Sequence, residues 1–173
     1  MSDYQIIAET PFVHLVERNG WSFATRPRVS GIVTIVAVTD DSEIVLVEQR
    51  RDAINGNVIE LPAGLVGDEP GHEGESLETA ARRELLEETG FECEQMIRLG
   101  SGTTSPGITD DQLTVFRARG LKRVSEGGGV DNENITVHTV AMAKLDEWMR
   151  ERERDGAVID LKIHAGIRMA AIG

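Results

Sequence analysis

The stretch from Glu75 to Phe91 constrains the fold more than any other part of the chain. It reads Glu-Ser-Leu-Glu-Thr-Ala-Ala-Arg-Arg-Glu-Leu-Leu-Glu-Glu-Thr-Gly-Phe. From Ser76 to Thr89 it contains neither Pro nor Gly, and most of its residues are strong helix formers. Gly90 then stands where a helix commonly ends on a glycine. The sequence therefore predicts a helix over residues 76–89.

Three glutamates crowd one edge of this predicted helix. At about 100° per residue, Glu84 and Glu88 lie roughly 40° apart, and Glu87 lies about 60° to the other side of Glu84. All three stand in the C-terminal half, where the helix dipole disfavours negative charge. One interpretation is a solvated acidic face with pairs such as Arg83 with Glu87. The other, which the flanking residues favour, is a site for a hard divalent cation, because Mg²⁺ prefers carboxylate oxygens.

The rest of the chain alternates extended and helical segments. Asn19-Gly20 is a strong hairpin turn, and it predicts that residues 13–17 pair with residues 21–25. Further strands are expected over 31–39, 43–49, 58–61, 92–100, 112–118 and 135–140, and further helices over 144–155 and 160–171. We expect an α+β protein with a small N-terminal β element over residues 1–28 and a main domain over 29–173.

Length and charge exclude several classes of protein. The 173 residues suffice for one domain with a core, but two are not expected. A net charge of −12 argues against a nucleic-acid binder, which needs a basic surface. No run of about 18 apolar residues is present, so no membrane span is expected. The single cysteine, Cys93, and the lack of a secretory signal pattern predict a cytoplasmic protein.

The residues around the helix resemble the motif of the Nudix hydrolase family. That motif reads Gly-x5-Glu-x7-Arg-Glu-U-x-Glu-Glu-x-Gly-U, where U is a bulky aliphatic residue. Every fixed position from Glu75 to Gly90 matches it, and the last U is Phe91, aromatic rather than aliphatic. Upstream, ten residues instead of five separate Gly64 from Glu75. The loop before the helix therefore carries a five-residue insertion.

The family resemblance implies an α/β/α sandwich with a mixed sheet that holds Mg²⁺, or Mn²⁺, against a diphosphate. Carried over to this chain, it makes Glu84, Glu88 and the backbone carbonyl of Ala63 the metal ligands. It makes Arg83 and Glu87 a pair that orients the helix and those ligands.

Two segments outside the motif resemble the ADP-ribose pyrophosphatase branch of the family. Glu48-Gln49-Arg50-Arg51 resembles that branch's Glu-Gln-x-Arg, which implies that Arg51 clamps a phosphate. Ser105-Pro106-Gly107 through Asp111 resembles its Ser-Pro-Gly loop, which ends in Glu rather than Asp, and implies substrate contacts from Ser105, Gly107 and Asp111. The alternatives are an arginine in a surface ion pair and a simple Pro-Gly turn.

The same branch places a general base or an additional metal ligand in an acidic loop before a late strand. Here that loop contains Glu133, the first candidate, and Asp131, the second, and sequence does not separate base from ligand. The resemblance also implies a homodimer in which the N-terminal strands reach the partner's site, with Arg28 as a candidate substrate contact. Trp21 and Phe23 stack on a base in one interpretation and pack the hairpin in the other.

The expected activity is metal-dependent hydrolysis of the diphosphate linkage of ADP-ribose or a related nucleoside diphosphate sugar. The products are a nucleoside monophosphate and a sugar phosphate. Within the family, the alternatives are GDP-mannose, NADH or a dinucleoside polyphosphate as substrate. A module that binds a nucleotide without cleaving it is a further alternative, although it does not explain why all three helix glutamates are present.

Overall fold

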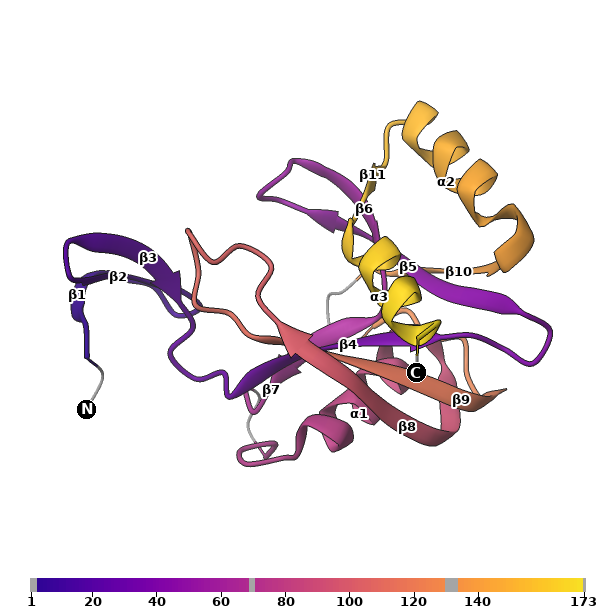
Figure 1. Cartoon of the computed structure of the whole chain (residues 1–173), viewed down its shortest axis with the longest axis horizontal. Coiled ribbons are helices and arrows are strands. Elements are labelled where there is room, and N and C mark those ends of the chain that lie inside the picture. The colour runs from indigo at the N-terminus through magenta and orange to yellow at the C-terminus, as the bar shows by residue number, and fades with distance from the viewer. Residues whose placement is uncertain (1–2, 69–70, 130–133, 173) are drawn as a thin grey trace.

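The chain forms three β-sheets and three α-helices in the computed structural model, which describes residues 3–68, 71–129 and 134–172 (Figure 1). Its N-terminal sheet is antiparallel in the order β1-β2-β3, with β1 at Gln5–Glu9, β2 at His14–Arg18 and β3 at Trp21–Thr25. Asn19 and Gly20 form the turn between β2 and β3 with φ of 54° and 79°. The predicted hairpin is confirmed.

A second, four-stranded sheet forms the centre of the molecule. Its order is β7-β4-β9-β8, with β4 at Gly31–Ala37, β7 at Ala63–Val66, β8 at Phe91–Gly102 and β9 at Leu113–Arg123. The β4–β9 pair is parallel and the other two pairs are antiparallel, so the sheet is mixed. Strand β4 is an almost unbroken apolar run, as expected for a strand covered on both faces.

The third sheet and two helices complete the fold. The sheet order is β10-β5-β6-β11, with β5 at Glu43–Arg51, β6 at Gly56–Glu60, β10 at Thr136–Ala141 and β11 at Val158–Ile159. Helix α2 spans Leu145–Arg154, after a short 3₁₀ turn η1 at Met142–Lys144, and helix α3 spans Lys162–Ala170. Among the described residues, none of these helices could span a lipid bilayer.

The core lies in two layers on opposite sides of β4. Val33 and Ile35 pack with Ala80, Ala81 and Leu85 of helix α1, which spans Leu77–Thr89. On the other side, a second cluster contains Val36 together with residues of β5, β6, α2 and α3, among them Leu46, Ile59, Met149 and Ile163. In Figure 1, α1 lies below the central strands while α2 and α3 lie above them. The expected α/β/α sandwich with a mixed sheet is confirmed.

Helix α1 begins and ends as its sequence predicts. The Ser76 side chain accepts a hydrogen bond from the backbone N–H of Thr79, which caps the N-terminus. Gly90 has φ of 74°, in the left-handed region, and its N–H donates to the carbonyl of Leu86. The motif residues Arg83 to Glu88 therefore lie on one regular helix, in its second half.

Several elements differ from the sequence-based expectation, among them β7, β9 and β11, which was not expected and pairs with β6. Strand β7 was not expected, because Pro62-Ala63-Gly64 has the composition of a turn; it forms because it pairs antiparallel with residues 31–34 of β4. Strand β9 continues to Arg123 rather than ending at residue 118, because its ladder with β8 extends to the Phe91–Arg123 pair.

Candidate active site

Glu84 of helix α1 lies directly against Gly64 of strand β7. A Cβ atom on Gly64 would stand 1.9 Å from Glu84 Cδ, so any side chain there would collide with the carboxylate. The Glu84 side chain is 14% exposed. The glycine that the family motif fixes at this position therefore provides the space in which the Glu84 carboxylate lies.

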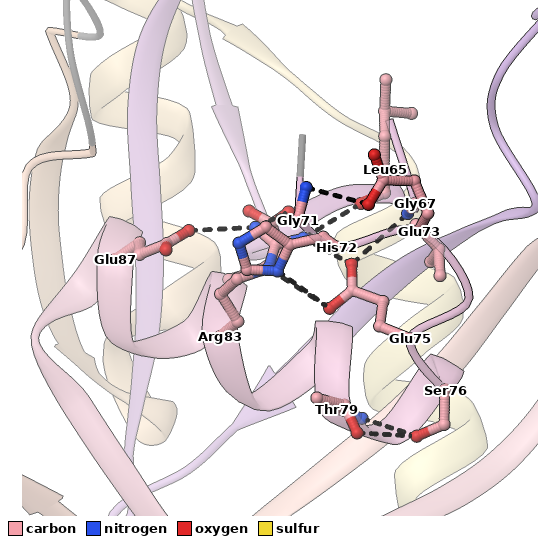
Figure 2. A network of polar contacts seen from close by, with 12 residues as sticks. Leu65, Gly67, Gly71, His72, Glu73, Glu75, Ser76, Thr79, Arg83 and Glu87 are labelled. Carbon is pink, nitrogen blue, oxygen red and sulfur yellow. Dashed lines mark hydrogen bonds and ion pairs between the residues drawn. The ribbon is translucent and has the colours of Figure 1, made fainter. Parts of the chain in front are cut away.

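Arg83 connects the carboxylates of this region, as Figure 2 shows in part. Its Nη2 contacts Glu75 Oε1 at 2.9 Å and donates to the carbonyl of Leu65 at 3.2 Å. Its Nη1 contacts Glu84 Oε1 at 2.8 Å and Glu87 Oε2 at 3.0 Å. The Arg83 side chain is 11% exposed and that of Glu75 is 6% exposed. A single guanidinium thus fixes three glutamates in a largely dehydrated place.

The inserted loop also reaches this network. Glu75 Oε1 accepts a hydrogen bond from the N–H of Gly67, and His72 Nδ1 lies 3.6 Å from Glu75 Oε2. Figure 2 shows the ring of His72 directed toward Glu75. The five extra residues therefore leave the contact between Glu75 and Arg83 intact.

Burial and charge shift the proton affinities of two of these glutamates in opposite directions. Burial raises the pKa of Glu84 to about 7, an effect that Arg83 opposes and the nearby Glu87 and Asp68 carboxylates reinforce. Burial also acts to raise the pKa of Glu75, but the hydrogen bonds from Arg83 and Gly67 outweigh it and hold that pKa below its ordinary value. Of these two carboxylates, Glu84 is the one whose charge the protein compensates less.

Glu88 is the most deeply buried glutamate of the helix, with 4% of the residue exposed. Its Oε2 accepts a hydrogen bond of 3.0 Å from the backbone N–H of Ala63. Helix α1 and strand β7 therefore also meet at Glu84 with Gly64 and at Glu88 with Ala63, in addition to the contact of Arg83 with Leu65. Glu84, Glu88 and Ala63 are the residues for which the family resemblance implies a metal.

The three helix glutamates line a cleft of about 490 Å³ together with basic residues from other parts of the chain. Ala63 and Gly64 form part of its wall, and Arg26, Arg51 and Lys162 contribute the positive charge. Acidic and basic side chains thus line the same space. A bound cation and the negative phosphates of a ligand can both be balanced in such a cleft.

Each basic residue of the cleft is held by an acid. Arg51 Nε contacts Glu60 Oε2 at 2.7 Å, and Glu60 is itself buried. Arg26 Nε lies 3.3 Å from Asp111 Oδ1, although without the geometry of a hydrogen bond. Lys162 pairs with Asp160: its Nζ contacts Asp160 Oδ2, and its backbone N–H donates a hydrogen bond to Asp160 Oδ1.

The structure brings some of the predicted substrate contacts to the cleft and leaves others outside it. Arg51 and Asp111 line the cleft, whereas Ser105, Gly107 and Arg28 do not line it within one chain. The carbonyl of Gly107 instead accepts a hydrogen bond from Trp21 Nε1, so this loop packs on the N-terminal sheet. Arg28 is exposed, with Nη2 3.4 Å from the carbonyl of Pro11.

Glu133 and Asp131, the candidates for the general base, lie outside the described residues.

Sequence reasoning missed several residues of the cleft, among them Arg26, Asp68 and Lys162. Arg26 and Arg28 flank Pro27 alike in the sequence, and only the end of β3 at Thr25 decides which of them faces the cleft. Lys162 follows Asp160 at the start of α3, and this acid–x–base pattern was the one available signal. Asp68 stands in the inserted loop, for which the family motif gives no guide.

The donor set around Gly64 fits a hard divalent cation. Among residues 3–68, 71–129 and 134–172, no three His, Cys, Asp or Glu side chains already converge as a metal site. Glu84 nevertheless offers a buried, poorly compensated carboxylate in a space that a Cβ on Gly64 would fill. Carboxylate oxygens are the ligands that Mg²⁺ and Mn²⁺ prefer.

Known proteins resemble this chain in sequence and in fold. The methanol dehydrogenase activator of Bacillus methanolicus is 40% identical over 126 residues, which is 72% of this chain and 65% of that protein. The ADP-ribose pyrophosphatase of Bacillus subtilis (strain 168) is 33% identical over 124 residues, which is 71% of this chain and 64% of that protein. The crystal structure of an ADP compounds hydrolase shares the fold, with a TM-score of 0.72 at 17% identity, covering 98% of this chain and 90% of that one.

The matched region spans just under two thirds of the length of these two relatives. A model of the NUDIX domain matches residues 29–158, which include every element from β4 to α2 and the whole motif around α1. The resemblance that the motif residues imply is thereby confirmed, and the chain belongs to the NUDIX domain family.

Proposed function

We propose that the protein hydrolyses the diphosphate linkage of ADP-ribose or of a related nucleoside diphosphate sugar, with Mg²⁺ as its metal. The products are a nucleoside monophosphate and a sugar phosphate. The observation that carries this proposal is one cleft that is lined by Glu84, Glu87 and Glu88 together with Arg26 and Arg51. The relative from Bacillus subtilis is an ADP-ribose pyrophosphatase, which supports the choice of substrate class.

Glu84 and Glu88, with the carbonyl of Ala63, are the residues that would hold the metal. NUDIX hydrolases generally depend on a divalent metal, and Mg²⁺ is the choice for this chain because its donors are oxygens. When bound, such an ion withdraws electron density from the phosphate oxygens and neutralises the charge that develops on them. Arg83 and Glu87 orient the carboxylates, because Arg83 links Glu87 to Glu84 through one nitrogen.

The basic residues of the cleft bind and orient the phosphates. The planar guanidinium groups of Arg51 and Arg26 suit phosphate oxygens, and their acidic partners fix their direction before the substrate arrives. In the reaction, a water oxygen forms a bond to one phosphorus and the bridging P–O bond breaks. The water's proton passes to a carboxylate, for which Glu133 is the first candidate and Asp131 the second, and the bridging oxygen leaves with its phosphate.

The N-terminal β element, residues 1–28, is proposed to form part of a homodimer interface. This element exposes several large apolar side chains, namely Ile6, Ile7, Leu15 and Trp21 in its strands and Phe12 between β1 and β2. Exposed apolar area of this kind commonly marks a surface that a partner covers. In such a dimer Arg28, Ser105 and Gly107 can contribute to the partner's cleft.

The cytoplasmic location also stays a prediction, based on the single cysteine.

A substrate panel tests the proposed function. The purified protein with Mg²⁺ is incubated with ADP-ribose, GDP-mannose, NADH and a dinucleoside polyphosphate, and monoester products are measured through added phosphatase. We expect the highest kcat/KM for ADP-ribose or another nucleoside diphosphate sugar. A higher kcat/KM for NADH or for a dinucleoside polyphosphate would show that the protein prefers that class of substrate instead. Tight nucleotide binding without any turnover would favour a binding module instead.

A further inference from the structure

The glycine-rich segment 124–129 lies on the C-terminal end of helix α1. Its backbone N–H groups donate to the carbonyls of the last helical turn, Gly128 to Glu88 at 2.9 Å and Gly129 to Glu87 at 3.0 Å. Val124 and Ser125 donate to the carbonyl of Gly90 just beyond the helix, at 2.8 and 3.2 Å. Carbonyls that a helix end normally leaves to water are therefore bonded to a loop distant in the sequence.

The contact is so close that one position of the loop requires glycine. Gly127 has φ of 71°, and a Cβ built on it would stand 2.4 Å from the carbonyl carbon of Thr89 and 2.7 Å from the carbonyl oxygen of Glu88. Both of these atoms belong to the backbone of the helix, so they cannot move away as the end of a flexible side chain does. Any side chain at residue 127 must displace the last turn of α1 or the loop itself.

The loop is fixed by its own contacts as well. The guanidinium of Arg123 donates to the carbonyls of Ser125 and Glu126, at 3.1 and 3.3 Å. The N–H of Ile135 donates to the carbonyl of Gly128 at 3.3 Å, which joins the start of the following segment to the loop. Residue 127 therefore lies in a segment with a defined backbone position on both of its sides.

This loop contacts the turn of α1 that carries two of the three acids. Glu87 and Glu88 stand in the last turn, which contains no basic residue, so the helix dipole disfavours their charges. Backbone N–H dipoles that point at the terminal carbonyls reduce this penalty and also fix the direction in which the two side chains leave the helix. An error of about 0.5 Å in ligand position is enough to impair a metal site.

We propose that Gly127 is a positioning residue for the metal site: by allowing the loop to bind the end of α1, it sets where the Glu87 and Glu88 carboxylates lie. The proposal rests on the proposed function only in taking Glu88 as a metal ligand. The loop therefore affects the affinity of the site for the metal, and not only the stability of the fold.

The test replaces Gly127 by Ala and measures Mn²⁺ binding by the loss of the free-ion electron paramagnetic resonance signal. Mn²⁺ alone is the probe, so neither substrate nor turnover is needed. We expect the dissociation constant for Mn²⁺ to rise about ten- to a hundredfold, the range seen when residues that support metal ligands are changed. With substrate, kcat should fall more than KM changes.

Gly156→Ala is the matched control. Gly156 has φ of 95°, and a Cβ on it would meet no atom within 4 Å. Alanine there imposes a similar backbone strain far from α1, so Mn²⁺ affinity should stay at the wild-type value. Equal Mn²⁺ affinities for Gly127→Ala and the wild type would overturn the proposal, and so would equal losses in both variants.

Arg123→Met provides a second variant if Gly127→Ala does not fold. It removes the donors to Ser125 and Glu126 without placing any atom against α1, and we expect a two- to threefold weaker Mn²⁺ affinity, about 0.4–0.7 kcal/mol. Wild-type Mn²⁺ affinity in that folded variant would also refute the proposal. The proposed function fails separately, if the wild-type protein with Mg²⁺ turns over no substrate of the panel.

Discussion

Replacing Arg83 by Met should destabilise the metal-free protein strongly. Met keeps most of the apolar stem of the side chain and removes the guanidinium. Glu75, Glu84 and Glu87 then lose their common cation, and the carbonyl of Leu65 loses a donor. Since the Glu75 and Glu84 side chains are only 6% and 14% exposed, water cannot replace the lost contacts.

The magnitude follows from burial. Breaking a buried ion pair by removing one partner costs about 3–5 kcal/mol, because an uncompensated charge stays buried. For a domain of this size each kcal/mol lowers Tm by about 2–4 °C, so Arg83→Met should lower Tm by about 6–20 °C. The adjacent Arg82→Met is the control: Arg82 pairs with Glu78 on the surface, with side chains 37% and 54% exposed, and donates one further hydrogen bond to the carbonyl of Cys93. An exposed pair of this kind contributes about 1 kcal/mol or less.

The assay is thermal unfolding by circular dichroism with EDTA present, at pH 7.5 and at pH 5. Without Arg83, the pKa values of the buried carboxyls in the folded state should lie above those in the unfolded chain. A raised folded-state pKa gives a penalty that is absent below the unfolded value and grows as pH rises. The Tm difference between Arg83→Met and the wild type should therefore be smaller at pH 5 than at pH 7.5.

Two results would contradict this reasoning. A Tm for Arg83→Met within about 3 °C of that for Arg82→Met would mean that the guanidinium compensates little buried charge. A Tm difference that is no smaller at pH 5 than at pH 7.5 would show that the destabilisation comes from lost packing or hydrogen bonding, because neutral carboxyls no longer need a cation.

The remaining predictions concern metal, chemistry and assembly. Glu88→Gln should keep its Tm near the wild-type value and lower kcat at least about a hundredfold with Mg²⁺, as measured with the coupled phosphatase assay; near-normal kcat would refute the ligand role. In the metal-free protein the pKa of Glu84 is about 7, so Mg²⁺ must displace a proton there, and calorimetry should show Mg²⁺ affinity falling as pH drops below 7. Gly64→Ala should lose Mg²⁺ binding while its far-ultraviolet spectrum stays helical, because the added Cβ would stand 1.9 Å from Glu84 Cδ. Light scattering coupled to gel filtration should give twice the chain mass, and Trp21→Asp should shift it toward the monomer; a wild-type monomer at micromolar concentration would exclude the dimer.

Local chemistry explains why much of the fold could be predicted from the sequence. The hairpin follows from Asn19-Gly20, whose left-handed φ values few other residue pairs adopt easily. Helix α1 follows from its composition, its Ser76 cap and Gly90. Strand β7 could not be predicted, because Ala63–Val66 becomes a strand only through its partner β4. Pairing partners are properties of the folded chain, and a window of sequence does not contain them.

The residues of the site likewise fall into those that could be predicted from the sequence and those that could not. The fixed spacing of the motif was enough to bring together Arg83, Glu84, Glu87 and Glu88, because one helix carries them all. Arg26 and Lys162 reach the cleft from segments more than 130 residues apart in the sequence. Neither belongs to a motif with fixed spacing, and each is one charged residue among 48. Only the packing of β3 and α3 around the cleft selects them.

The three acids in the second half of α1 also explain why the site is assembled from so many parts of the chain. A helix end disfavours negative charge, and burial disfavours it further. The compensation comes from three different segments: Arg83 of the helix itself, the N–H of Ala63 at the start of β7, and the N–H groups of Gly128 and Gly129. At Glu84 this compensation is incomplete, since burial raises its pKa to about 7. A bound divalent cation would supply the positive charge that is missing there.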